Sequence, residues 1–183
     1  MAQIEKIGTK LRKKHISTLN QIHINTKGMS TKQHRYDQSS KYYYAPYGAI
    51  NINYNQVSCR FNPQDKQFFI TPQSAFTIVD ATKANFQSSS KRYYPSIALT
   101  QSKQNDIYKI HGNFSKNDLK SNDFNFRVSR PNLHAAYVIQ HQLNNQDITI
   151  LKPPSSGQYS LKGLKKILTL TSKPLPYYLD ILN

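Results

Sequence analysis

Tyrosines interleaved with basic side chains between His34 and Phe61 form the strongest candidate for a binding surface in this sequence. This stretch holds six tyrosines together with Arg35, Lys41 and Arg60. Aromatic rings stack on exposed bases while neighbouring cations hold the phosphates, so such a surface suits single-stranded nucleic acid. Tyrosine is also common at strand ends and subunit contacts, so protein–protein contact and plain packing stay open as alternatives.

The net charge of the chain also indicates a nucleic-acid partner. Its 183 residues include 25 Lys and Arg against 9 Asp and Glu, a formal net charge of +16. A field of this size needs a counter-charge, most often nucleic acid and less often an anionic membrane or an acidic protein. Residues 1–41 carry nine basic and two acidic residues, so they are more than twice as dense in net charge as residues 42–183.

We therefore predict a non-enzymatic, basic structural protein that binds nucleic acid, RNA rather than DNA, inside a larger assembly. A viral capsid or nucleocapsid and a ribosome-like ribonucleoprotein particle both fit, with other subunits or further copies of the chain as protein partners. Contacts to the phosphate backbone would give affinity without sequence specificity. The residues predicted to bind nucleic acid are Lys6, Lys10, Arg12, Lys13, Lys14, Arg35, Lys41, Tyr42, Tyr43, Tyr44, Tyr47, Lys162, Lys165 and Lys166. His15, His23 and His34 would add hydrogen-bond donors to phosphate.

Two other functions remain open. The first is a protein–protein assembly subunit whose charge meets an acidic partner. The second is a metal-dependent nuclease, because Asp118 and Lys120 have the Asp-x-Lys spacing that places a carboxylate and a cation on one face of a strand. Asp106 or Asp123 would supply a second carboxylate and His111 a base.

Other catalytic and metal-binding patterns are weak or missing. Ser155 and Ser156 have no strand–turn–helix elbow around them, so we do not expect either to be a nucleophile. His134 and His141 lie two helical turns apart, too far to chelate one ion readily, and are expected to be surface or helix-packing residues. Cys59 is the only cysteine, which excludes an intrachain disulfide and a cysteine-based zinc site. We expect no metal and no cofactor.

The chain offers few signs of its cellular location. No apolar run approaches the ~20 residues that a membrane helix needs, and no secretory apolar region follows Met1. With its single cysteine, the sequence favours an intracellular reducing compartment or a virion.

Two helices are predicted from the pattern of apolar residues. Apolar residues at helical spacing predict a basic amphipathic helix over about residues 2–22, which Gly8 and the off-stripe Ile16 weaken. Residues 23–41 have no periodicity and are expected to be an extended linker. Ser129 as N-cap and Pro131 in the first turn predict a second helix over about 131–144.

Short runs of alternating or β-prone residues predict about seven strands. They cover residues 50–54, 66–71, 74–80, 93–100, 106–111, 123–128 and 147–151. Residues 84–92, 112–122 and 152–159 are expected to be loops, and residues 160–171 fit either a helix or a strand. The fold class is therefore α+β and β-rich. We expect a single, mostly antiparallel sheet or a β-sandwich (residues 42–183), preceded by a basic helical arm (residues 1–41), with one or two further helices.

Overall fold

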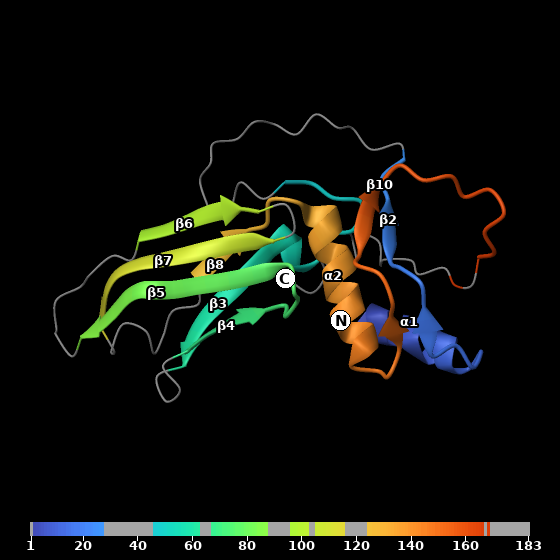
Figure 1. Cartoon of the computed structure of the whole chain (residues 1–183), viewed down its shortest axis with the longest axis horizontal. Coiled ribbons are helices and arrows are strands. Elements are labelled where there is room, and N and C mark those ends of the chain that lie inside the picture. The colour runs from blue at the N-terminus through green and yellow to red at the C-terminus, as the bar shows by residue number, and fades with distance from the viewer. Residues whose placement is uncertain are drawn as a thin grey trace, which may run out of the picture.

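The structure is a computed structural model that describes residues 2–27, 46–62, 67–87, 96–102, 105–115, 124–166 and 168. It confirms an α+β fold rich in strands with a helix at the N-terminus (Figure 1). The helices are α1 (Ala2–Arg12) and α2 (Pro131–Asn144). The strands are β1 (Thr18–Leu19), β2 (His23–Asn25), β3 (Gln56–Asn62), β4 (Gln67–Thr71), β5 (Thr77–Gln87), β6 (Ser96–Gln101), β7 (Asp106–Ser115), β8 (Phe124–Arg127), β9 (Thr149–Ile150) and β10 (Ser155–Gly157).

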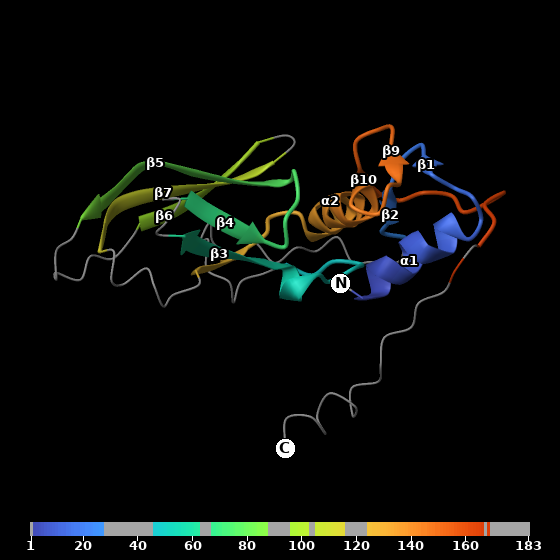
Figure 2. The same cartoon turned by 90° about the horizontal axis from the view of Figure 1, so that it is seen from below.

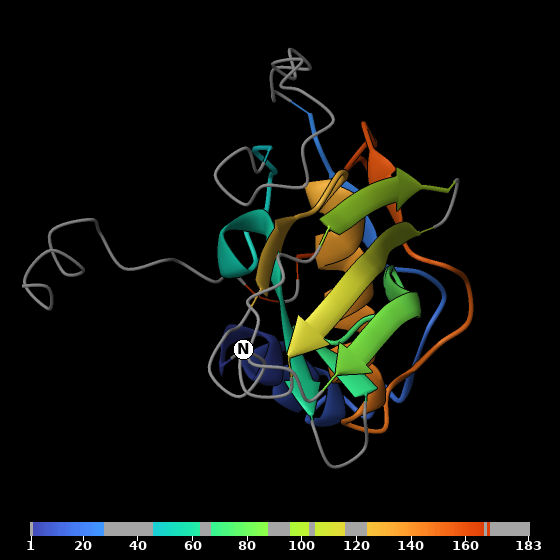
Figure 3. The ribbon, with the colours of Figure 1, turned by 90° about the vertical axis from the view of Figure 1, so that its left-hand side faces the viewer.

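Two three-stranded sheets form a sandwich. One sheet has the order β4-β3-β8 and is antiparallel, whereas in the other, β5-β7-β6, β5 runs parallel to β7 and β6 antiparallel to it. Figure 2 shows the two sheets as separate layers, and Figure 3 shows them from the end of the sandwich. Val57, Cys59 and Phe61 of β3 alternate with more exposed residues, and they are buried against Tyr108 and Ile110 of β7. Period-2 alternation on β3 therefore builds the core between the layers.

In the other half of the molecule, the N-terminal segment (residues 2–25) and the segment after α2 (residues 145–157) come together beside α2. Helix α1 lies against α2, and Leu11, Leu143 and Ile148 form a second buried cluster there. β1 pairs with β9 and β2 pairs with β10, both in parallel. None of the helices in the described ranges is long and apolar enough to cross a membrane.

The N-terminal helix is shorter than predicted. It ends at Arg12, and His15 has a positive φ of 56°, which turns the chain out of helical geometry. The turn directs Ile16 and Leu19 into the cluster around Leu11, and β1 lies where the helix was predicted to continue. β2 lies at the start of the predicted extended linker, where no strand was predicted. The boundary that we predict near residue 41 lies outside the described residues and stays a prediction.

The strand predicted over residues 50–54 is wrong. Asn53, Tyr54 and Asn55 all have positive φ and form a single 3-10 turn, so the strand begins only at Gln56. Asn55 is buried there, and its side-chain amide donates to the carbonyl of Pro46 (2.8 Å) and to Oδ1 of Asn51 (2.6 Å). Asparagine tolerates left-handed geometry and bonds nearby backbone, which explains why the alternation did not give a strand.

The remaining elements are close to their predicted positions. Helix α2 has the predicted bounds, although Arg130 occupies the N-cap position and Ser129 bonds a side chain from another element. β5 and β7 extend into residues predicted as loops, and β10 lies inside the predicted loop 152–159. The described part of 160–171 is neither helix nor strand.

Candidate active site

A serine and a histidine lie side by side where β2 pairs with β10. The parallel register of β2 and β10 places Ser155 beside His23, and both side chains are half-buried. The Oγ atom of Ser155 is 2.8 Å from Nδ1 of His23. β2 and β10 lie side by side in Figure 1. A hydroxyl within hydrogen-bond reach of an imidazole nitrogen is the arrangement of an activated nucleophile and its base.

The second ring nitrogen of His23 fixes the direction of this hydrogen bond. Nε2 of His23 is 3.2 Å from the carbonyl oxygen of Gly157, which can only accept a hydrogen bond. In the neutral ring Nε2 therefore carries the hydrogen, and Nδ1 offers its lone pair to the hydroxyl of Ser155. This is the tautomer in which the imidazole acts as a general base.

Backbone hydrogen bonds hold the pair in register. The N–H of Ser155 donates to the carbonyl of Ile22 (3.0 Å), and the N–H of Thr26 donates to the carbonyl of Gly157 (2.9 Å). Just beyond, the side-chain amide of Asn25 donates to the carbonyl of Tyr159 (3.0 Å). The geometry thus comes from strand pairing between segments about 130 residues apart, not from a local motif.

An open depression of about 490 Å³ lies next to Tyr159, which contacts His23; neither Ser155 nor His23 lines it. The ring of Tyr159 links the depression to His23, because its centroid is 5.1 Å from that of His23 and it also lines the depression. The lining residues are Lys27, Gln158, Tyr159, Ser160, Leu161 and Lys162. Two lysines at the rim make this a favourable place for an anionic group such as a carboxylate.

A second polar cluster, around Asp106, is structural. Asp106 is fully buried, and it accepts hydrogen bonds from the backbone N–H of Ser129 (2.7 Å) and from the hydroxyl of the same residue. Arg130 lies 3.9 Å from the carboxylate. Burial raises the pKa of Asp106 above its ordinary value, and the Ser129 hydrogen bonds act against that rise. The cluster fixes the start of α2, and its carboxylate is fully buried.

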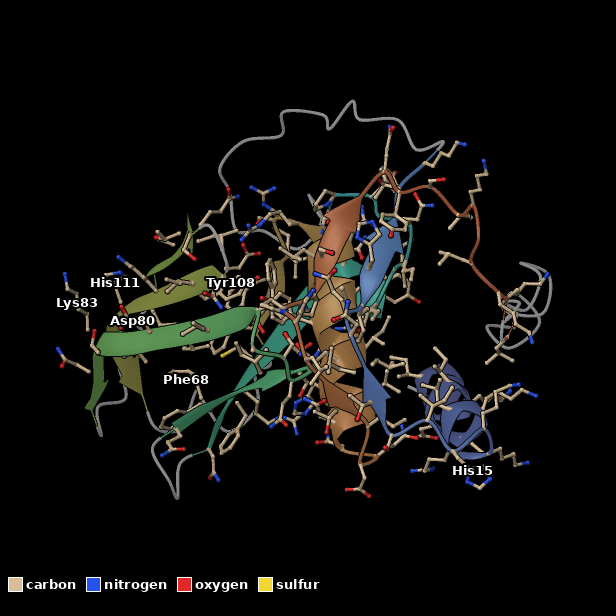
Figure 4. The ribbon with its side chains drawn as sticks, turned by 45° about the vertical axis from the view of Figure 1, so that its right-hand side comes forward. His15, Phe68, Asp80, Lys83, Tyr108 and His111 are labelled. Atoms are coloured by element: carbon tan, nitrogen blue, oxygen red, sulfur yellow. The ribbon has the colours of Figure 1, made fainter. Side chains whose placement is uncertain are left out.

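Of the proposed nuclease residues, the structure describes only Asp106 and His111, and these two lie apart. Asp118 and Lys120, like Asp123, lie outside the described residues. His111 is five residues from Asp106 along β7, about 17 Å in an extended strand. Figure 4 shows His111 with Asp80 and Lys83 near one end of the sandwich and His15 beside α1. Within the described ranges, no three His, Cys, Asp or Glu residues are grouped to hold a metal ion.

The residues predicted to bind nucleic acid are placed as follows. Lys6, Lys10 and Arg12 on α1 are exposed, as are Lys13 and Lys14 in the turn after it. Tyr47 is 84% exposed, and Lys162, Lys165 and Lys166 are exposed in the segment after β10. Arg35, Lys41, Tyr42, Tyr43 and Tyr44 lie outside the described residues. Nothing in the structure tests their contact with nucleic acid.

Sequence reasoning missed the Ser155–His23 pair. His23 was assigned to an extended arm, and Ser155 was set aside because no elbow motif surrounds it. The two residues are 132 positions apart, and only the pairing of β2 with β10 brings them together. No local signal in the sequence marks that pairing.

One comparison with known proteins is informative. The model of the D-Ala-D-Ala carboxypeptidase 3 (S13) family matches residues 1–183. No curated protein matches the chain. The family match contradicts our prediction of a non-enzymatic, nucleic-acid-binding structural protein of a capsid or ribonucleoprotein, and equally the acidic-partner subunit and nuclease alternatives. The charge of +16 by itself does not identify a partner or an activity.

Proposed function

Because the chain belongs to the D-Ala-D-Ala carboxypeptidase 3 (S13) family, we propose that it is a carboxypeptidase that releases the last residue of peptides ending in D-alanyl-D-alanine. The match of the family model over residues 1–183 is the observation that carries this proposal. The described residues add a serine with a base, which is the chemistry that hydrolysis of a peptide through an acyl-enzyme requires.

The Ser155–His23 geometry supports the following steps. Oγ of Ser155 attacks the carbonyl carbon of the penultimate residue while Nδ1 of His23 takes the hydroxyl proton. The imidazolium then returns this proton to the amine of the departing D-alanine, which leaves an ester on Ser155. A water molecule, deprotonated by the same nitrogen, hydrolyses the ester and restores the serine.

The depression next to Tyr159 is suited to the free carboxylate of such a substrate. Lys27 and Lys162 line it, and both side chains are exposed and carry positive charge. A substrate that ends in a carboxylate would be held with its last peptide bond toward Ser155, whereas an amidated peptide would lose this attraction.

A different serine, Ser88, lies in a motif that is typical of acyl-transfer enzymes. Ser88 and Lys91 have the S-x-x-K spacing found in penicillin-binding proteins and class A β-lactamases, where the serine is the nucleophile. Both residues lie outside the described ranges. Ser88 is therefore the alternative nucleophile for the same proposed reaction.

The test is release of free D-alanine from a short peptide ending in D-alanyl-D-alanine. We expect wild-type protein to release it and Ser155→Ala to lower kcat by ~10³-fold or more, because the nucleophile is gone. Ser156→Ala is the matched control, since this neighbouring serine is exposed and is paired with Ile24 in the register, not with His23.

These measurements test the proposed reaction and the identity of its nucleophile separately. If wild-type protein releases no D-alanine, the proposed function is wrong. If Ser155→Ala keeps full activity and Ser88→Ala loses it, the function stands and the nucleophile is Ser88.

A further inference from the structure

The segment after β10 and the outer side of α1 form one continuous surface. We call it the lysine–leucine surface and define it as residues 159–166, Leu168, and the exposed residues of α1 with the turn after it. Leu168 lines a depression of about 460 Å³ together with Lys6, Lys10 and Lys13, so the segment after β10 comes close to α1 at Leu168.

The surface exposes apolar side chains that nothing in the described residues covers. Leu161 is 64% exposed and Leu164 is 61% exposed, with Tyr159 and Leu168 also among the exposed apolar residues. The N–H of Leu164 donates to the carbonyl of Leu161 (3.1 Å), and Gly163 has a φ of 79°. This is a tight turn with glycine at its left-handed position, so the two leucines lie close together at its base.

The same surface is strongly cationic. Its exposed basic residues are Lys6, Lys10, Arg12, Lys13, Lys14, Lys162, Lys165 and Lys166. Glu5 is the single acidic residue among the described residues of this surface. Ile4 and Leu11 of α1 are buried, and Leu11 packs against Leu143 of α2, so α1 contributes charge and not apolar area to the surface.

We propose that the lysine–leucine surface binds the face of a membrane that contains acidic phospholipids. The leucines at the turn would enter the boundary between headgroups and acyl chains, while the lysines on either side lie over lipid phosphates. A dissolved polyanion would neutralise the lysines but leave the leucines in water, so the combination of both favours a lipid surface. The surface shares Tyr159, Leu161 and Lys162 with the depression proposed for the substrate carboxylate, but vesicle binding can be measured without the proposed reaction.

The test is co-sedimentation of the full chain with vesicles. We expect binding to phosphatidylcholine vesicles that contain phosphatidylglycerol and little binding to phosphatidylcholine alone. Lys165→Ala with Lys166→Ala should weaken binding by ~25-fold, since each lysine near such a surface contributes about a factor of five. Leu161→Ser with Leu164→Ser should weaken it by ~10-fold or more, and to a similar extent at high salt.

A matched control lies at the other end of the molecule. Ile78 is 44% exposed and Lys83 is exposed on β5, so Ile78→Ser with Lys83→Ala removes the same kinds of group from outside the surface. This variant should bind vesicles like the wild type. The proposal is wrong if the leucine variant binds as tightly as the wild type, or if single-stranded RNA binds the chain while acidic vesicles do not.

Discussion

At the scale of single residues, burial controls the protonation of His134. It is fully buried in the first turn of α2, and neither ring nitrogen has a hydrogen-bond partner. The ring of Phe76 lies 5.9 Å from it, centroid to centroid. Burial lowers the pKa of His134 from 6.5 to about 4, because the charged imidazolium would be desolvated there.

Acidification should therefore destabilise the protein. Between pH 6.5 and about 4 the unfolded chain binds a proton at His134 that the folded chain does not, so the free energy of unfolding falls as the pH falls. We expect a loss of roughly 3 kcal/mol across this window. Urea unfolding at pH 7 and at pH values down to 4 measures it.

Replacement of the histidine identifies the source of the effect. His134→Leu keeps an apolar side chain of similar size and should remove most of the loss between pH 6.5 and 4. Asp106 has a raised pKa and therefore acts in the opposite direction, because its folded form takes up a proton earlier than the unfolded chain. An unchanged pH profile in His134→Leu would contradict the assignment.

At the scale of elements, α2 packs against α1 and the β1–β9 pair. Leu143 is 1% exposed near its C-terminal end and packs with Leu11 and Ile148, and Ile139 packs against the same cluster. This single cluster attaches α1 and the β1–β9 pair to the helix. Disrupting this cluster should therefore weaken the packing of α1 and the β1–β9 pair on α2.

Leu143→Ala should lower the free energy of unfolding by ~2–5 kcal/mol, because it leaves a cavity among residues from three elements. Leu151→Ala is the control, since Leu151 is 65% exposed and its truncation should change stability by no more than about 0.5 kcal/mol. Denaturant unfolding of the two variants measures the difference. Equal values for both would mean that the second cluster contributes little.

The elements also show what the sequence can and cannot predict. The bounds of α2 were predicted correctly because Pro131 and the apolar spacing are local signals. The sandwich strands followed from alternation, as for Phe126 on β8. The strand predicted over residues 50–54 failed because three successive residues adopt positive φ, which depends on the buried contacts of Asn55. The Ser155–His23 pair depends on long-range pairing alone and could not be predicted.

At the scale of the whole molecule, the charge of +16 works against compactness. Folding brings like charges together, and the repulsion between them is screened by salt. The Tm should therefore rise as NaCl is added from a very dilute buffer to physiological concentration. Differential scanning fluorimetry over a salt series, with sucrose at matched osmolality as control, measures the rise. A flat or falling Tm would mean that ion pairs within the fold outweigh the repulsion.

The parallel pairing of β2 with β10 also has a consequence for synthesis of the protein. His23 leaves the ribosome early, but its partner Ser155 follows 132 residues later. A partly translated chain therefore holds the base without the serine and cannot assemble this pair. If Ser155 is the nucleophile, the enzyme stays inactive until the segment that carries β10 has been synthesised, and a chain that ends before β10 is inactive as well.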